Sequence, residues 1–219
     1  MSIKVKLLKS QGKQLYYNCV RRQACLTAHN QLALIAQQIL NCRKCPLHKT
    51  RKNPVPGEGN PQAKTILIGE APGYWEDIKG KPFVGAAGKF LDTLLATANL
   101  TRQQIYITNI LKCRPPRNRP PQPNETKACT PYLDQQIQTI KPQIIITLGN
   151  HATAYIFQKA QLPYTSITQQ HGKPQNAKLL GIRLTIYPTF HPAAALHNPK
   201  YKTLLQQDFQ KLKQTLNQT

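Results

Sequence analysis

The sequence predicts an α/β fold in which a mostly parallel sheet carries helices on both faces. Four short runs of β-type residues are separated by longer segments in which apolar residues recur at helical spacing. Strands that alternate with helices form parallel sheets, because each crossover helix returns the chain to the same end of the sheet. A chain of 219 residues is long enough for one such domain with a sizeable core.

The first part of the chain, residues 1–28, is basic and has weak periodicity. We interpret it as an N-terminal extension and a candidate DNA-contacting arm, followed by a single domain at 29–219. The extension contains Cys19 and Cys25, and five intervening residues are not a usual spacing for a pair of metal ligands. These two cysteines are therefore expected to take no part in a site.

The domain is expected to begin with an amphipathic helix at 29–40. Strands are then predicted at 65–68, 105–108, 143–148 and 182–187, and helices at about 86–98, 124–140, 151–159 and, as a closing amphipathic helix, 201–216. The proline-rich stretch 114–121 is too stiff for a helix or a central strand, so it is predicted to be a basic loop.

Polar residues directly follow each predicted strand. They are Glu70, Asn109, Asn150 and His191, each within a short turn that also contains glycine, threonine or phenylalanine. In a parallel sheet, ligands bind in the crevice beyond the carboxyl ends of the strands. The sequence therefore predicts that these turns line one pocket.

The charge balance of the chain is extreme, with 30 Lys and Arg against 8 Asp and Glu and a formal net charge of +22. Such a field attracts polyanions and favours nucleic acid as the partner, although a solubility device or a basic proteome would give the same balance. No stretch approaches the roughly 20 apolar residues that a membrane span needs, and the N-terminus has no secretory pattern. We expect a cytoplasmic, nucleoid-associated protein, with an organellar or viral setting left open.

Four cysteines, Cys42, Cys45, Cys113 and Cys129, have the pattern of a C-x2-C pair followed by two separate thiols. A structural zinc site usually offers two close pairs, and only one pair is close here. Proline follows Cys45 directly, and a Cys-Pro step recurs in bacterial iron–sulfur sites. The spacing favours a [4Fe-4S] cluster over zinc, and four unlinked buried thiols are the third possibility.

Several motifs in order resemble the family 4 uracil-DNA glycosylases. The first motif is Gly69-Glu70-Ala71-Pro72-Gly73, followed by Glu76-Asp77, Gly80, Pro82-Phe83-Val84-Gly85 and Ala87-Gly88. The central motif is Asn109 with Lys112-Cys113-Arg114-Pro115-Pro116 and Asn118-Arg119. The last two motifs are Leu148-Gly149 and Phe190-His191-Pro192-Ala193. The similarity covers the chain from about Leu32 to the C-terminus, and the four cysteines stand at the family's cluster-ligand positions. It implies a three-layer α/β/α sandwich around a four-stranded parallel sheet, and a [4Fe-4S] cluster.

The resemblance also assigns roles in removing uracil, a reaction that builds negative charge on the base and positive charge on the sugar. His191 is expected to donate a hydrogen bond to the departing base. The Asn109 amide offers the donor and acceptor that match uracil O4 and N3–H, whereas cytosine presents the opposite pattern. Phe83 is expected to stack on the base, and Glu76 is similar to the family residue near uracil C5, where it could exclude a thymine methyl. Three of these residues also have a structural alternative: His191 as a turn cap, Asn109 as a βα-turn residue and Phe83 as a core ring.

The group that activates water is less well determined. Family 1 glycosylases have an aspartate at the position of Ala71, which is expected here only to contact uracil. Glu70 is the nearest carboxylate and our first choice for orienting water and stabilising the sugar cation. A purely structural Glu70 is the alternative, with Glu76 and Asp77 as reserves.

DNA contacts are expected around the pocket. Small residues at the start of the helix at 86–98 would let a phosphate approach free N–H groups. The expected contacts are Gly85, Ala87, Gly88, Arg114, Arg117, Arg119, Leu196 as a wedge, and Lys200. Where the family has large apolar residues and an arginine, this chain has Ala193-Ala194-Ala195-Leu196-His197, which predicts weaker activity on duplex than on single strands.

The sequence therefore predicts a monomeric DNA-repair glycosylase that flips uracil out of single- or double-stranded DNA and leaves an abasic site. A non-catalytic nucleic-acid-binding module with a structural metal site of four cysteines is the alternative from another class. A glycosylase for hypoxanthine or mismatched thymine is a third reading, against which Asn109 argues. A contact with a partner such as a sliding clamp would be sought in residues 1–28.

Overall fold

The protein is built on one six-stranded sheet in the order β1-β3-β2-β4-β6-β5. The computed structural model describes residues 27–217. The strands are β1 (Glu58–Gly59), β2 (Thr65–Gly69), β3 (Ile105–Asn109), β4 (Ile144–Leu148), β5 (Gln175–Leu179) and β6 (Ile182–Thr189). The four central strands run parallel, and β1 and β5 pair antiparallel at the two edges. The four predicted parallel strands are thus confirmed, and two edge strands widen the sheet.

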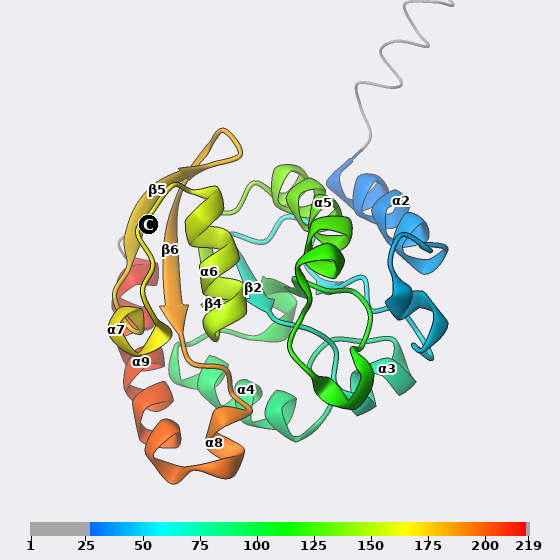
Figure 1. Ribbon diagram of the computed structural model, residues 1–219. Helices are drawn as coiled ribbons and strands as arrows, with labels where there is room; N and C mark the ends of the chain where they lie inside the picture. Colours follow the sequence, from blue (N-terminus) through cyan, green and yellow to red (C-terminus); the bar gives the residue numbers. More distant parts are fainter. Residues whose placement is uncertain (1–26, 218–219) are drawn as a thin grey trace, which may run out of the picture.

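The helices cover both faces of this sheet (Figure 1). The α-helices are α2 (Ala28–Leu40), α3 (Tyr74–Lys79), α4 (Ala86–Thr97), α5 (Pro123–Ile140), α6 (Asn150–Lys159), α7 (Ile167–Gln170), α8 (Ala194–His197) and α9 (Pro199–Asn217), with 3-10 turns at Pro46–Lys49, Arg102–Gln104 and Pro116–Asn118. The five long helices match the predicted segments within about two residues, as expected from strong periodicity. The proline-rich stretch is a loop with one 3-10 turn, because its prolines exclude longer regular structure.

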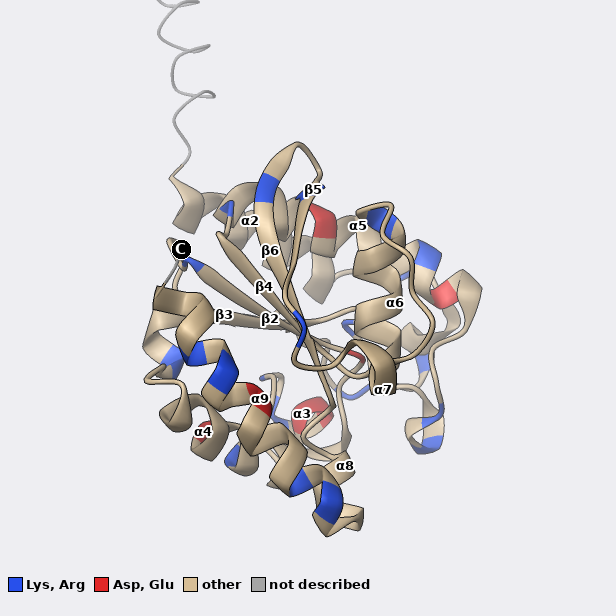
Figure 2. Ribbon diagram, turned by 90° about the vertical axis from the view of Figure 1, so that its left-hand side faces the viewer, with Lys and Arg blue, Asp and Glu red and all other residues tan. Residues whose placement is uncertain are grey.

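Side chains alternate along the strands between two hydrophobic cores. Ile66 and Ile68 face a core shared with α2, α5 and α6, whereas Leu67 faces a core shared with α4 and α9. This alternation follows from the two-residue period of a strand, and burial on both faces explains the continuous apolar runs. Figure 2 shows the resulting three layers, with the sheet between the α4–α9 layer and the α5–α6 layer.

The strand register brings the predicted site residues to one edge of the sheet. Gly69 at the end of β2 is directly opposite Asn109 at the end of β3, and Leu148 of β4 is opposite Thr189 of β6. The turns after these strands therefore meet at a single crevice.

Cys19, Cys25 and most of the expected N-terminal extension lie outside the described residues. Within residues 27–217, no helix is both long enough and apolar enough to cross a membrane.

Candidate active site and four-cysteine cavity

The crevice at the carboxyl ends of the strands holds a cavity of about 380 Å³. Its lining combines residues from three of the four predicted turns: Glu70, Ala71, Pro72, Gly73, Glu76, Phe83, Ala87, Asn109, Pro115, Asn118, Arg119, His191 and Ala193. The fourth turn was wrongly expected there: Asn150 does not line the cavity, because its Oδ1 accepts from the Tyr164 hydroxyl at 2.6 Å and the Ile167 amide at 3.0 Å. The structure thus brings together the predicted catalytic and base-binding side chains, which are spread along the sequence from Glu70 to His191.

Asn109 forms the polar floor of the cavity. Its side chain is 2% exposed, and its Oδ1 is the one buried side-chain polar atom in the described part of the chain that lacks a hydrogen-bond partner. An unsatisfied buried acceptor costs about 1–3 kcal/mol, so it is retained where a ligand supplies the donor. A Cβ at Gly69 would lie 2.4 Å from this oxygen, and glycine there keeps the acceptor clear.

Phe83 forms an apolar wall in a strained conformation. Its φ of 51° lies in the left-handed region, which bulky side chains rarely adopt. Arg102 holds the turn, since its guanidinium donates to the carbonyls of Phe83 at 2.7 Å and Gly88 at 3.3 Å and forms an ion pair with Asp92 at 2.6 Å. Gly88 is buried under the turn, where a Cβ would lie 1.8 Å from the Phe83 carbonyl oxygen. Glycine at position 88 therefore allows the helix to pack closely against the Phe83 turn.

His191 faces Phe83 across the cavity, with the rings stacked at a centroid distance of 5.6 Å. The backbone N–H of Ala193 donates to His191 Nδ1 at 3.1 Å, so Nδ1 carries no proton and the neutral ring holds its proton on Nε2. Burial lowers the pKa of His191 to about 4, opposed in part by the negative charge of Glu76. The preceding Thr189 donates to the buried Asp208 at 2.6 Å, which anchors this strand end to α9.

The Glu76 carboxylate is hydrogen-bonded to the backbone of the Phe83 turn. Its Oε1 accepts from the N–H groups of Val84 at 2.8 Å and Gly85 at 2.9 Å. The Gly85 amide, one of the donors expected to meet a phosphate at the start of α4, is thereby occupied. Glu76 still lines the cavity, whereas Asp77 does not: Asp77 is buried and accepts from the Lys52 amide at 2.9 Å.

Glu70 lies at the mouth of the cavity and is paired with His151, the second residue of α6. The His151 Nδ1–H donates to Glu70 Oε2 at 2.8 Å, and both side chains are partly exposed. The sequence analysis did not identify His151 or Arg102, because their partners are 81 and 19 residues away and no local pattern marks such pairs.

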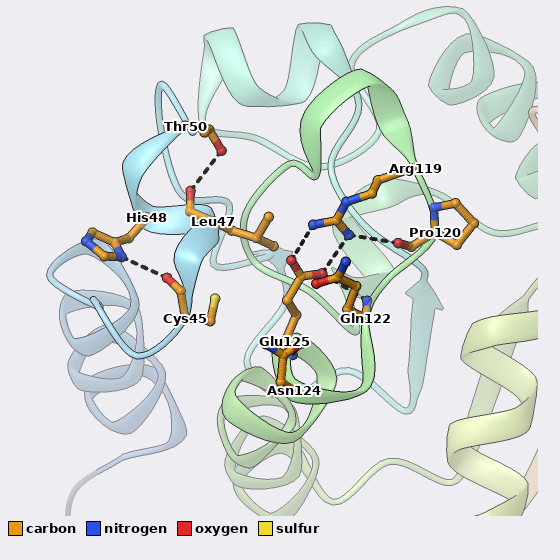
Figure 3. A network of polar contacts seen from close by, with 9 residues as sticks. All are labelled: Cys45, Leu47, His48, Thr50, Arg119, Pro120, Gln122, Asn124 and Glu125. Carbon is orange, nitrogen blue, oxygen red and sulfur yellow. Dashed lines mark hydrogen bonds and ion pairs between the residues drawn. The ribbon is translucent and has the colours of Figure 1, made fainter.

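The basic loop lies beside the cavity with its arginines in different environments. Arg119 forms a bidentate ion pair with the fully buried Glu125, shown in Figure 3, and this guanidinium lowers the Glu125 pKa. Arg114 lies 5.2 Å from the ring centroid of Tyr74, and Arg117 is exposed. Leu196 on α8 and Lys200 in the first turn of α9 do not line the cavity, and both are exposed.

The four predicted cysteine ligands line a second, smaller cavity, together with residues that include Arg51, Lys112 and Tyr132. Cys42 and Cys45 come from the turn after α2, Cys113 from the loop after β3 and Cys129 from α5. Figure 3 shows Cys45 at the start of a 3-10 turn in which His48 bonds its carbonyl at 2.7 Å. Among residues 27–217, no three His, Cys, Asp or Glu side chains form a group that could hold a metal ion.

Two of these sulfurs receive hydrogen bonds from the protein. Arg51 donates to Cys113 Sγ at 3.0 Å, and the Lys112 backbone N–H donates to Cys129 Sγ at 3.2 Å. Donors of this kind stabilise thiolates, but burial outweighs the lowering by Lys112 and raises the pKa of Cys129 to about 12.

Lys112 connects this cavity with the first one. Its ammonium group is buried and donates to the Asn109 carbonyl and Gln136 Oε1, both at 2.8 Å, and to Thr108 Oγ1 at 2.6 Å. The residue next to the predicted ligand Cys113 therefore holds the backbone of Asn109 in place.

Comparison with known proteins gives concordant matches. The family model described as "Uracil DNA glycosylase superfamily" matches residues 56–216. A type-4 uracil-DNA glycosylase from Saccharolobus solfataricus is 50% identical over 86% of this chain and 88% of its own. Type-4 enzymes from Sulfurisphaera tokodaii and Archaeoglobus fulgidus are 47% and 46% identical, over 84% and 81% of this chain and 84% and 89% of their own.

Proposed function

The chain belongs to the uracil DNA glycosylase superfamily, and we propose that it is a DNA-repair enzyme of the type-4 group, which flips uracil out of DNA and hydrolyses its N-glycosidic bond. The observation that carries this assignment is the buried, unpartnered Asn109 Oδ1 at the floor of a cavity walled by Phe83 and His191. Uracil supplies the missing donor. The products are free uracil and an abasic site.

Recognition rests on matching donors and acceptors. Uracil N3–H donates to Asn109 Oδ1, and the amide N–H faces O4. Cytosine has an unprotonated N3 and an amino group at these positions, so it leaves the buried amide unpaired at a cost of about 1–3 kcal/mol for each group. The base stacks on Phe83, and the cavity of about 380 Å³ leaves ample space for a single pyrimidine.

Bond cleavage is assisted at the departing base by His191. The Ala193 amide fixes the neutral tautomer, so Nε2–H is the donor that stabilises negative charge on uracil. A ring that is neutral at physiological pH stabilises this charge by hydrogen bonding and does not need to transfer a full proton.

The sugar side of the reaction is assigned to Glu70. Its carboxylate is at the mouth of the cavity, and His151 holds one of its two oxygens. We assign the other oxygen to orienting the attacking water and stabilising the positive charge on the sugar. Glu76 remains a reserve for this role, since its Oε1 holds the Phe83 turn by accepting from two backbone amides.

The second cavity suits a [4Fe-4S] cluster. Its donor set is four cysteines, two of which accept N–H···S hydrogen bonds, and one close C-x2-C pair with two separate thiols is a ligand pattern that favours an iron–sulfur cluster over zinc. The cysteines that would hold the cluster are Cys42, Cys45, Cys113 and Cys129. When bound, the cluster supplies a rigid thiolate-ligated tie between α2, α5 and the loop after β3.

Around the cavity, we assign DNA-backbone contacts to the exposed Arg117 and Lys200 and to the free amides at the start of α4, with Leu196 as the wedge. The protein acts as a monomer at the nucleoid, in the cytoplasm, with 29–219 as the glycosylase domain and 1–28 as a basic extension.

The deciding experiment measures uracil release by the full chain, with its cluster intact, from a single-stranded oligonucleotide that contains one uracil. We expect release of uracil from this strand and none of thymine from a matched control. His191→Ala is the matched inactive variant. A non-catalytic binding module would bind both strands, release nothing and be indifferent to this substitution, which would overturn the assignment.

A further inference from the structure

Beside the cavity is an exposed aromatic surface that the glycosylase reaction does not use. Tyr74 and Trp75 form the first turn of α3 and are 52% and 54% exposed, and Ile78, one turn later, is 41% exposed. Large apolar side chains are usually more deeply buried, and a group of them at the surface marks a binding site. We call Tyr74, Trp75 and Ile78 the α3 surface.

The α3 surface is continuous with the uracil cavity. The residues on either side of the aromatic pair, Gly73 and Glu76, both line the cavity. A Cβ at Gly85 would lie 3.4 Å from Trp75 Cδ1, so the indole rests against the turn that begins α4. A strand whose uracil occupies the cavity must therefore pass close to Trp75.

The two rings and a neighbouring cation form an ordered arrangement. Tyr74 meets Trp75 edge to face, with centroids 5.2 Å apart and planes at 80°. Arg114 lies over the Tyr74 ring at 5.2 Å and donates to Asn118, another cavity-lining residue, at 2.8 Å. Aromatic faces with an adjacent arginine are the elements with which proteins hold unpaired bases without reading their sequence.

We propose that the α3 surface is a stacking site for an unpaired base of the DNA strand that flanks the flipped uracil, with Trp75 as the stacking ring and Tyr74 as its support. The inference rests on the proposed glycosylase function and adds a nucleotide subsite to it. Three side chains are too small a surface for a stable protein partner, which buries about 800 Å² on each side, and a chain of net charge +22 favours a polyanion.

This site gives the enzyme a preference for uracil in single-stranded or frayed DNA. In an intact duplex the flanking base is already stacked and paired, so it must leave its neighbours before it can reach Trp75. In a single strand the same base is free, and stacking on an aromatic ring then adds to the affinity.

The chain provides its own probe, because Trp75 is its single tryptophan. The full chain with its cluster intact is titrated with a short single-stranded oligonucleotide that contains 2′-fluoro-2′-deoxyuridine, whose fluorine disfavours the sugar cation and prevents cleavage. Tryptophan emission reports stacking, and anisotropy of a dye on the DNA reports binding. We expect quenching that saturates together with binding.

Oligonucleotides with abasic spacers beside the uracil then identify the stacked base. Removing the base that contacts Trp75 should abolish the quenching and weaken Kd by about 5- to 100-fold. Trp75→Ala should weaken Kd for the intact strand by a similar factor, and Trp75→Phe, which keeps a stacking face, by no more than about threefold. Leu34→Ala is the matched control, since Leu34 is 47% exposed on α2 and does not line the uracil cavity, and it should bind as the wild type does.

Saturating binding without a change in emission, or quenching that no abasic spacer alters, would overturn the stacking site. Equal loss of affinity in the Leu34→Ala control would do the same. The natural uracil strand, assayed in parallel, separates the two proposals. Uracil release without quenching refutes only the α3 site, and quenching without release refutes only the glycosylase.

Discussion

The floor and the rim of the uracil cavity differ in how far their side chains are buried and in how firmly they are held. In this comparison the floor comprises Asn109 and the two walls, Phe83 and His191. Asn109 and Phe83 are buried, and hydrogen bonds to the Phe83 carbonyl and to His191 Nδ1 hold these two residues in place. On the rim, Trp75, Arg117 and Leu196 are exposed to solvent. Under the proposed function, the buried groups would read the base and the exposed groups would hold the DNA strand. Substitutions on the floor should lower the rate of the chemical step, and substitutions on the rim should weaken binding.

The largest effect is expected from His191→Ala. Removing the donor to the departing base should lower the single-turnover rate by about 100- to 1,000-fold, the usual loss for one such donor. The DNA affinity should change little, because the ring contacts only the flipped base. A loss that appears in affinity and leaves the rate intact would place His191 with the rim.

Asn109→Ala should have the next largest effect. The loss of a buried donor and acceptor should lower kcat/KM for uracil by about 5- to 100-fold and reduce discrimination against cytosine. Competition between uracil- and cytosine-containing strands measures the second quantity. Unchanged discrimination would show that the amide only supports its turn.

A smaller effect is expected on the rim from Leu196→Ala. An apolar wedge loses contact area with the opened base step, so activity on duplex DNA should fall by about fivefold while activity on single strands is kept. The ratio of duplex to single-strand rates is the measurement. An equal fall on both substrates would assign Leu196 to the support of α8.

The last prediction is that the protonation state of His191 does not change near neutral pH. His191 has its pKa lowered to about 4 by burial, so its ring should stay neutral from pH 8 down to about 5.5 and gain a proton only as the pH approaches 4. Imidazole ¹⁵N resonances should show His191 protonated on Nε2, with no titration in that range. A midpoint near 6.5 would contradict a fixed neutral ring on the floor.

The sequence was informative where function and local pattern coincide. Asn109 and His191 follow apolar strands directly, so the βα topology alone predicts that they share a crevice. The edge strands were missed because β1 has only two residues and β5 is largely polar, which removes the β-type signal. The α3 helix was missed because six residues are too few to establish a period.

The supporting contacts could not be predicted for a different reason. Arg102 and His151 act through partners that only the folded chain brings near, and nothing in their sequence neighbourhoods distinguishes them from other basic residues. Lys112 stands in one of the motifs, but its buried contact with Gln136 is 24 residues away and no local pattern indicates it. Arg119 illustrates the converse case. Its place in a basic loop suggested a phosphate contact, and the structure shows its guanidinium forked onto the buried Glu125.

The left-handed backbone at Phe83 has a consequence for which substitutions this turn accepts. A side chain at positive φ costs about 1–2 kcal/mol relative to glycine, a sizeable part of the net stability of a domain. Glycine would relax the turn, but it would also remove a ring that is 6% exposed and packs in the core shared with α4 and α9, and truncating a buried phenylalanine costs about 3–5 kcal/mol. The packing of the ring therefore outweighs the strain of its backbone, and the turn cannot be relaxed by glycine without opening a hole beside the cavity.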